Sequence, residues 1–166
     1  MSRAEQENMS AMELSVLTDE DAALVGSWPS YTGEFAPLDY ALREDGWFGM
    51  YPEGKESHRF AVRDAGNLIG FSLLVYITQE DAEILVALHP LHTGKGFGRE
   101  VVLKTLNHAF GVLRLQCVYM TVRPHHKAIP LYESIGFRKT GAVSEKIIRG
   151  EKVSLVRMEI RRNDRA

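Results

Sequence analysis

The sequence has a single cysteine, Cys117, among 166 residues, which excludes an internal disulfide and most thiolate metal sites. Cys117 lies in the apolar run LQCVYMTV, which is typical of a small buried side chain. No run approaches the roughly 20 apolar residues that a membrane helix needs. The first ten residues, MSRAEQENMS, lack the apolar stretch of a secretion signal. We therefore expect a cytoplasmic protein with no membrane partner.

The sequence also lacks an excess of positive charge. Its formal net charge is −2, so a nucleic-acid-binding surface is not expected. The six histidines are scattered, and no metal site is predicted from them. The length, with 45% hydrophobic and 25% charged residues, suits one globular domain over residues 1–166. Residues 1–10 are expected to form a disordered tail.

Hydrophobic periodicity and turn signals predict alternating strands and helices. Strands are expected at residues 12–17, 59–63, 68–77, 82–88, 115–122, 143–148 and 152–160. Helices are expected from an N-cap at Thr18 to residue 27, over residues 98–110, and over residues 125–134 before a C-cap at Gly136. Residues 28–55 show no clean period. This order predicts a mixed α/β domain with strand–helix–strand crossovers in its second half.

Glycines alternate at positions 94, 96 and 98 in the segment HTGKGFGRE, between a predicted strand and a predicted helix. The spacing does not match the G-x-G-x-x-G dinucleotide fingerprint, and Gly96 stands where a Walker A loop needs Ser or Thr. Two interpretations stay open on the loop alone. Bare amides at a helix start can bind an anion, with Lys95 and Arg99 at the rim. Alternatively, the segment is a tight turn that uses glycine for positive φ.

A second motif lies downstream, where residues 122–137 read VRPHHKAIPLYESIGF. Together the two motifs resemble the GNAT superfamily of acyl-CoA-dependent N-acyltransferases, whose loop reads [R/Q]-x-x-G-x-[G/A] and whose later helix carries L-Y-x-x-x-G-F. Gly96 and Gly98 match the loop. The later motif is matched by Ala128, Leu131, Tyr132, Gly136 and Phe137. Thr93 departs from the usual Arg or Gln, and His125 departs from the common Asn.

This resemblance implies a fold and an acyl donor. The fold is a single-domain α/β GNAT-like fold, with a mixed, mostly antiparallel twisted sheet of about 6–7 strands, splayed in the middle and flanked by about 4 helices. The donor is acetyl-CoA, bound as a co-substrate without a metal. Its pyrophosphate is expected on the amides of residues 94–99, and its pantetheine arm along residues 87–89. The residues expected to bind it are Leu88, His89, Gly94, Lys95, Gly96, Phe97, Gly98, Arg99, His125 and Lys127.

The implied chemistry is attack of a neutral amine on a thioester, which needs an acid for the thiolate and a base for the amine. Tyr132 is expected to be the acid, since a phenol pKa of about 10 lies close to that of a thiol. The alternative is that Tyr132 only packs, with its hydroxyl bonded to backbone. Glu83 is expected to be the base, and its alternative is an edge-strand charge facing solvent. His89 is a second candidate base.

Residues 28–53 carry the clue to the acceptor. They hold seven of the fifteen aromatic residues of the chain, and five acids against one base, Arg43. Aromatic faces and carboxylates suit a cationic amine, and Trp28, Tyr31, Phe35 and Tyr40 are expected to bind it. The alternative is that these aromatics only attach the segment to the core.

Two classes of function remain open on the sequence. One is an N-acetyltransferase that transfers acetyl directly from acetyl-CoA to a primary amine within a ternary complex. The other is a catalytically silent acyl-CoA-binding sensor. The acceptor is expected to be a small-molecule or peptide amine, with metabolite, polyamine, drug and protein N-terminus not separated. A monomer or homodimer is expected.

Overall fold

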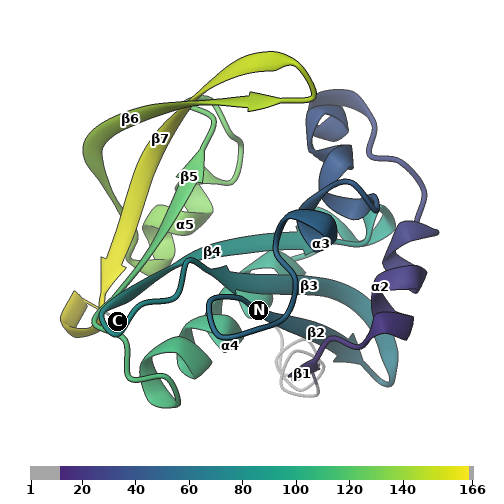
Figure 1. Ribbon diagram of the computed structural model, residues 1–166, viewed down its shortest axis with the longest axis horizontal. Helices are drawn as coiled ribbons and strands as arrows, with labels where there is room; N and C mark the ends of the chain where they lie inside the picture. Colours follow the sequence, from purple (N-terminus) through teal and green to yellow (C-terminus); the bar gives the residue numbers. More distant parts are fainter. Residues whose placement is uncertain (1–11, 165–166) are drawn as a thin grey trace.

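The computed structural model describes residues 12–164, which form one seven-stranded sheet with helices on both faces (Figure 1). The strands are β1 (Met12–Val16), β2 (His58–Asp64), β3 (Asn67–Val75), β4 (Asp81–Leu88), β5 (Cys117–Val122), β6 (Arg138–Ile148) and β7 (Glu151–Arg161). Their order across the sheet is β1-β2-β3-β4-β5-β7-β6. Only β4 and β5 pair in parallel. The expected mixed, mostly antiparallel α/β fold is thus confirmed. The tail expected at residues 1–10 lies outside the described residues.

The helices divide between the two faces of the sheet. They are α2 (Asp19–Gly26), α3 (Trp47–Met50), α4 (Phe97–Gly111) and α5 (Ile129–Ile135), with 3₁₀ turns η1 (Gly33–Leu42), η2 (Pro90–His92) and η3 (Arg162–Asp164). Buried residues of α4 and α5 pack on one face, and those of α2, η1 and the segment around α3 pack on the other. Helix α2 begins at the expected cap, where the Thr18 hydroxyl accepts from the Asp21 N–H and the Asp21 carboxylate accepts from the Thr18 N–H.

The parallel pairing of β4 with β5 is unusually short. It covers three residue pairs, from Asp81 opposite Cys117 to Glu83 opposite Tyr119. Beyond these pairs the two strands diverge, as Figure 1 shows, so the middle of the sheet opens along residues 84–88 and 120–122. The opening has helices on one side and η1, α3 and the β6–β7 hairpin on the other. This divergence creates the space for a site.

The second half of the chain differs from the sequence expectation at two boundaries. Strand β6 begins at Arg138 rather than at residue 143, because its pairing with β7 shifts between Lys139 and Val143 around Gly141, whose φ is +87°. Helix α5 begins at Ile129 rather than at residue 125. Residues 125–128 instead form a turn, in which the His126 Nδ1 accepts from the Ala128 N–H at 3.0 Å.

Residues 28–55, which have no clean period, fold into η1 and the single turn α3. The two pieces approach so closely that a Cβ at Gly46 would lie 1.7 Å from the carbonyl oxygen of Tyr40. Glycine at this position is therefore required by contact between backbones. The contact holds the aromatic residues of η1 and α3 against the sheet opening.

Candidate active site

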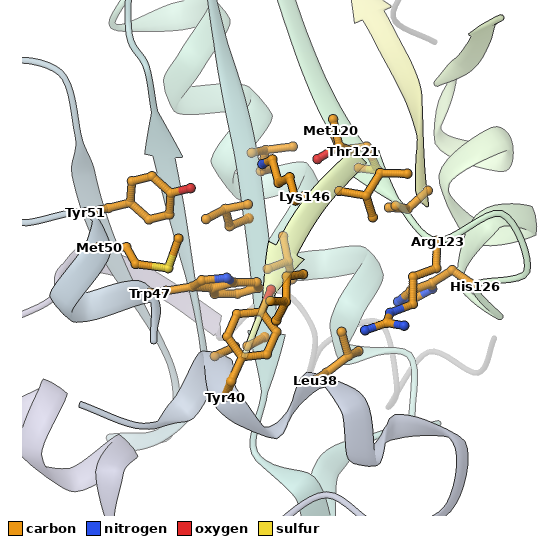
Figure 2. Close-up of a pocket in the computed structure, with 18 of the residues that line it drawn as sticks. Leu38, Tyr40, Trp47, Met50, Tyr51, Met120, Thr121, Arg123, His126 and Lys146 are labelled. Atoms are coloured by element: carbon orange, nitrogen blue, oxygen red, sulfur yellow. The ribbon is translucent and has the colours of Figure 1, made fainter. Parts of the chain in front are cut away.

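A cavity of about 230 Å³ lies between the diverging strands. Residues 84–87 of β4 and 120–122 of β5 line it, together with Arg123 just after β5 and Tyr132 of α5. The acceptor-side lining comes from Tyr40, Trp47 and Tyr51, and residues 146–149 of the β6–β7 hairpin complete it. Figure 2 shows Trp47 and Tyr40 on one side of this space and Met120, Thr121 and Arg123 on the other. The lining of the cavity thus comes from four separate segments of the sequence.

To this opening, strand β4 presents backbone groups that its neighbour β3 does not pair. The His89 N–H donates to the Ile69 carbonyl at 2.8 Å, and β3 pairs with β4 in antiparallel register. Hydrogen bonding alternates along such a ladder, so the N–H and C=O groups of Val86 and Leu88 point away from β3 and toward the opening. We call these groups the inner edge of β4. They can pair with an extended amide-containing ligand, as expected for a pantetheine arm near residues 87–89.

Tyr31 covers part of this inner edge. Its hydroxyl donates to the Leu88 carbonyl, and its backbone N–H donates to the Asp39 carboxylate at 3.2 Å. Burial raises the pKa of Tyr31 to about 12, so the hydroxyl stays protonated. Tyr31 therefore connects the segment before η1 to the strand at which the acyl donor is expected. The sequence placed it only among the acceptor residues.

Glu83 is the last β4 residue that pairs with β5, and it therefore lies at the closed end of the opening. Its side chain is 2% exposed, and the strand lies inside the sheet, so it is not an edge-strand charge facing solvent. The Glu83 Oε1 accepts from the Thr121 hydroxyl at 3.1 Å and lies 4.0 Å from the Lys146 Nζ. The buried Oε2 has no hydrogen-bond partner among the described residues. One carboxylate oxygen thus remains available to a ligand.

Tyr132 lines the same cavity from α5. Its ring packs near His126 and Phe137, with ring centroids 6.1 Å and 6.2 Å away. Burial raises the pKa of Tyr132 to about 12. Within residues 12–164 its hydroxyl makes no hydrogen bond to backbone or side chain, so the packing alternative with a backbone-tied hydroxyl has no support. Its role as the acid stays a prediction.

The glycine-rich loop prepares an anion site at the start of α4. Gly94 and Gly96 have φ of +75° and +85°, and Gly96 is the N-cap of a helix that begins at Phe97. The backbone N–H groups of residues 94–96 have no acceptor within the described part of the chain. Lys95 is exposed, and Arg99 donates to the Ser134 hydroxyl at 2.9 Å, which links α4 to α5. Free amides at a helix start fit the pyrophosphate of acetyl-CoA.

Gly98 differs from the other two loop glycines, because its φ is not positive and a Cβ would meet only Leu88 and Leu131 at 3.6 Å and 3.8 Å. The fold alone does not require glycine there, which leaves close approach of a ligand as its physical reason. We expect Gly98→Ala to raise the KM for acetyl-CoA about tenfold, with little change in Tm. Steady-state kinetics and thermal unfolding check this.

Gly66→Ala, in the turn between β2 and β3, is the matched control for that measurement. The positive φ of +85° at Gly66 should make the substitution lower stability by about 1 kcal/mol, while the KM for acetyl-CoA changes little. An unchanged KM in Gly98→Ala, or equal changes of KM in both variants, would contradict the ligand role of Gly98.

The remaining predicted donor residues lie at two places. His89 packs on Trp28, with ring centroids 4.8 Å apart, and its Nδ1 accepts from the Leu91 N–H at 3.1 Å, which weakens its case as a base. His125 and Lys127 line a second hollow of about 420 Å³, between η1, residues 123–127 and the start of β7. The Lys127 Nζ lies 2.7 Å from the Glu34 Oε1. Lys127 therefore has an ion-pair partner on η1.

The four predicted acceptor residues do not come together. Tyr31 and Tyr40 line the cavity between the strands, whereas Phe35 lines the second hollow beside His125. Trp28 is 6% exposed, packs on Phe71 in the core, and lines neither space. For Trp28 the geometry favours the alternative in which an aromatic attaches the segment to the core.

Some site residues were not predicted from the sequence. Thr121, Lys146 and Arg123 line the cavity, and His126 fastens the turn before α5. His125 stands where the family commonly has Asn, but the hydrogen bond that fastens the turn comes from its neighbour His126. Thr121 could have been found from the parallel register of β4 and β5. Lys146 could not, because only the folded hairpin brings it to Glu83.

His126 makes the turn before α5 sensitive to acid. Burial, with a smaller effect of Arg123, lowers its pKa below 6.5, and its Nδ1 must be unprotonated to accept from Ala128. The unfolded chain then binds the proton more readily than the folded chain, so stability is full above pH 6.5 and falls as the pH drops below it. Burial also lowers the pKa of His89 and His108. We expect Tm to fall on acidification, and less steeply in His126→Gln; equal slopes would contradict a contribution from His126.

No group of three or more His, Cys, Asp or Glu residues within residues 12–164 could hold a metal ion. Among the helices that these residues form, none has the length and apolar character that crossing a bilayer requires. The expected absence of a metal stays a prediction.

Comparison with known proteins gives a consistent family. Residues 4–137 match the Acetyltransferase (GNAT) family. A spermidine N(1)-acetyltransferase of Vibrio cholerae is 38% identical over 107 residues, which are 61% of this chain and 62% of that protein. The alignment thus spans less than two thirds of that relative. A Vibrio cholerae spermidine N-acetyltransferase in complex with CoA and spermine superposes with a TM-score of 0.77 at 28% identity, over 93% of this chain and 98% of that one.

A further solved structure of the Vibrio cholerae spermidine N-acetyltransferase, described as dodecameric and in an intermediate state, has a TM-score of 0.72 at 28% identity. It covers 93% of this chain and 95% of that one. The likeness therefore extends over nearly the whole chain in three dimensions.

Proposed function

The chain belongs to the GNAT acetyltransferase family, and from this premise we propose that it transfers an acetyl group from acetyl-CoA to a primary amine. The observation that carries the proposal is the opening between β4 and β5. There the cavity lined by the β4 backbone and the partly buried Tyr132 lies next to Glu83, whose buried Oε2 has no hydrogen-bond partner among the described residues. A silent acyl-CoA sensor would need only a binding site. The acid and base candidates beside the opening therefore favour an enzyme.

The residues of the loop and the inner edge fit the acyl donor. The free amides of residues 94–96 and the N-terminus of α4 would hold the pyrophosphate, and the Val86 and Leu88 backbone would pair with the pantetheine amides. When bound, acetyl-CoA supplies a thioester that an amine can attack and a thiol leaving group. The glycine at position 98 leaves room for the donor beside Leu88.

Glu83 would accept the proton of the amine at Oε2. The Thr121 hydroxyl donates to Oε1, which limits rotation of the carboxylate and leaves Oε2 without a hydrogen-bond partner among the described residues. The Lys146 Nζ lies 4.0 Å from Oε1, on the side of the carboxylate that Thr121 also contacts.

Tyr132 would donate the proton that the departing thiolate needs. Its raised pKa of about 12 makes it a weaker acid than a phenol in water. Burial acts in the same direction on a thiol, as it raises the pKa of Cys117 in this protein. If burial also raises the pKa of the departing thiol, the pKa values of phenol and thiol stay closer together than the raised value for Tyr132 alone suggests.

Membership of the family also bears on the acceptor, the domain organisation and the oligomeric state. The names of the relatives support an amine acceptor, and spermidine is the first acceptor to assay. We keep the proposal of one GNAT domain over residues 1–166. Cytoplasmic location and a monomeric or homodimeric state stay predictions, the latter beside a relative described as dodecameric.

Two measurements test the proposed function. Thermal unfolding with acetyl-CoA, CoA, ATP and NAD should show stabilisation by the two CoA ligands alone, since a ligand stabilises the state that binds it. Release of free CoA thiol across an amine panel should then exceed hydrolysis in the absence of amine. Stabilisation by acetyl-CoA without thiol release for any amine would support the sensor and overturn the enzyme.

A further inference from the structure

Most acidic residues of the acceptor segment already lie beside a basic group of this chain. Residues 28–53 carry five carboxylates, which led to the expectation of a cationic acceptor. Four of them lie beside a basic group, and the fifth, Glu44, lines neither space. The pairs are Asp39 with Arg43 at 2.8 Å, Glu34 with Lys127 at 2.7 Å, Asp45 with Arg149 at 3.4 Å, and Glu53 with His58 at 3.1 Å. The segment therefore offers few free negative charges to a polycation.

The charges that line the cavity are mostly positive. Arg123, Lys146 and Arg149 line it, against Asp45 as the one acidic lining residue in the described chain. Arg149 has Asp45 as a partner, and Lys146 has Glu83. Arg123 has no carboxylate within ion-pair distance among residues 12–164. Figure 2 shows it on the β5 side of the cavity, opposite Tyr40 and Trp47.

This distribution has room for one ammonium group. The free oxygen of Glu83 can receive the reacting amine. A second ammonium on the same molecule would find no unpaired carboxylate in the lining that the described residues form, because Asp45 already has Arg149 as a partner, and it would lie near Lys146 and Arg123. Placing like charges together in a partly desolvated space is unfavourable.

We propose that the acceptor is a primary amine that carries a carboxylate at its far end, and that Arg123 binds this carboxylate. The inference rests on the proposed function and names the substrate class of that site. An arginine fork binds a carboxylate with two parallel hydrogen bonds, which gives both strength and orientation. The amine is then directed toward Glu83, while the apolar lining of Tyr40, Trp47 and Tyr51 contacts the carbon chain. This would separate the chain from the polyamine acetyltransferases to which it is similar.

The test compares three amines of equal carbon number that differ only at the far end: 6-aminohexanoate, hexylamine and hexane-1,6-diamine. We expect kcat/KM to be highest for 6-aminohexanoate and about tenfold or more lower for the diamine, the range of a charged hydrogen-bonded contact. Spermidine is assayed beside them and should follow the diamine. A diamine or spermidine that equals or exceeds the amino acid overturns the inference but leaves the proposed function intact. If no amine in the panel causes release of the CoA thiol, the proposed function itself is overturned.

Arg123→Gln identifies the residue responsible. We expect it to remove the preference for 6-aminohexanoate over hexylamine while the KM for acetyl-CoA stays the same. The matched control is Arg138→Gln, at an exposed arginine that lines neither space, and it should keep the preference. If Arg123→Gln raises the KM for acetyl-CoA and keeps the preference, Arg123 serves the acyl donor and the inference fails.

Discussion

Glu83→Gln is expected to lower kcat by about 100-fold or more while the KM for acetyl-CoA changes little. Glutamine keeps the size of the side chain and can still accept from the Thr121 hydroxyl, but it cannot take a proton from the amine. The defect should shrink as the assay pH rises toward the amine pKa of about 10.4, because the acceptor then arrives unprotonated. Steady-state rates across that pH range measure both effects.

Glu80→Gln is the matched control for this substitution. Glu80 is exposed just before β4, so the same chemical change there should leave kcat unaltered. Glu83→Gln with at least half of the original kcat, or with a defect that does not depend on pH, would show that another group accepts the proton. Thermal unfolding of both variants separates loss of chemistry from loss of fold.

Tyr132→Phe is expected to lower kcat by a similar factor, about 100-fold, without a change in Tm. The hydroxyl makes no hydrogen bond within residues 12–164, so its removal should cost the folded state nothing. With a pKa of about 12, Tyr132 stays protonated throughout an ordinary assay range. Any loss of activity at moderately alkaline pH must therefore come from a different group.

An acyl donor with a more acidic thiol provides the decisive comparison. Such a thiolate leaves without help, so Tyr132→Phe should lose much less activity with it than with acetyl-CoA. Tyr76→Phe, at a tyrosine that is 53% exposed, is the control and should behave like the unaltered protein with both donors. Equal losses with both donors would assign Tyr132 a packing role.

The fold was predictable where local signals agree with tertiary structure. The cap at Thr18 and the periodic helix after Gly96 both fold as the sequence indicates. The start of β6 was missed, because the shifted pairing around Gly141 depends on β7 as a partner. The start of α5 was missed, because the contact from His126 to the Ala128 N–H competes with a first helical turn. Both misses concern interactions that periodicity does not contain.

The site was predictable in its motifs but not in its charges. Glu83, Tyr132 and the glycine loop are local features, and each lies beside the opening of the sheet. The count of acids over residues 28–53 could not reveal their ion pairs, because Lys127 and Arg149 come from distant segments and pair with two of them. Trp28 misled for a related reason: an aromatic side chain suits a ligand and a core equally well, and here the core includes it.

The opening in the sheet also bears on edge-to-edge strand pairing between molecules. A seven-stranded sheet has two outer edges, here β1 and β6, and the divergence of β4 and β5 adds two more in its interior. Exposed strand edges invite pairing with other chains and lead to aggregation. The interior edges are covered by η1, α3 and the hairpin, and Tyr31 caps the Leu88 carbonyl. The fold thus covers with its own segments the strand edges that the divergence of β4 and β5 creates.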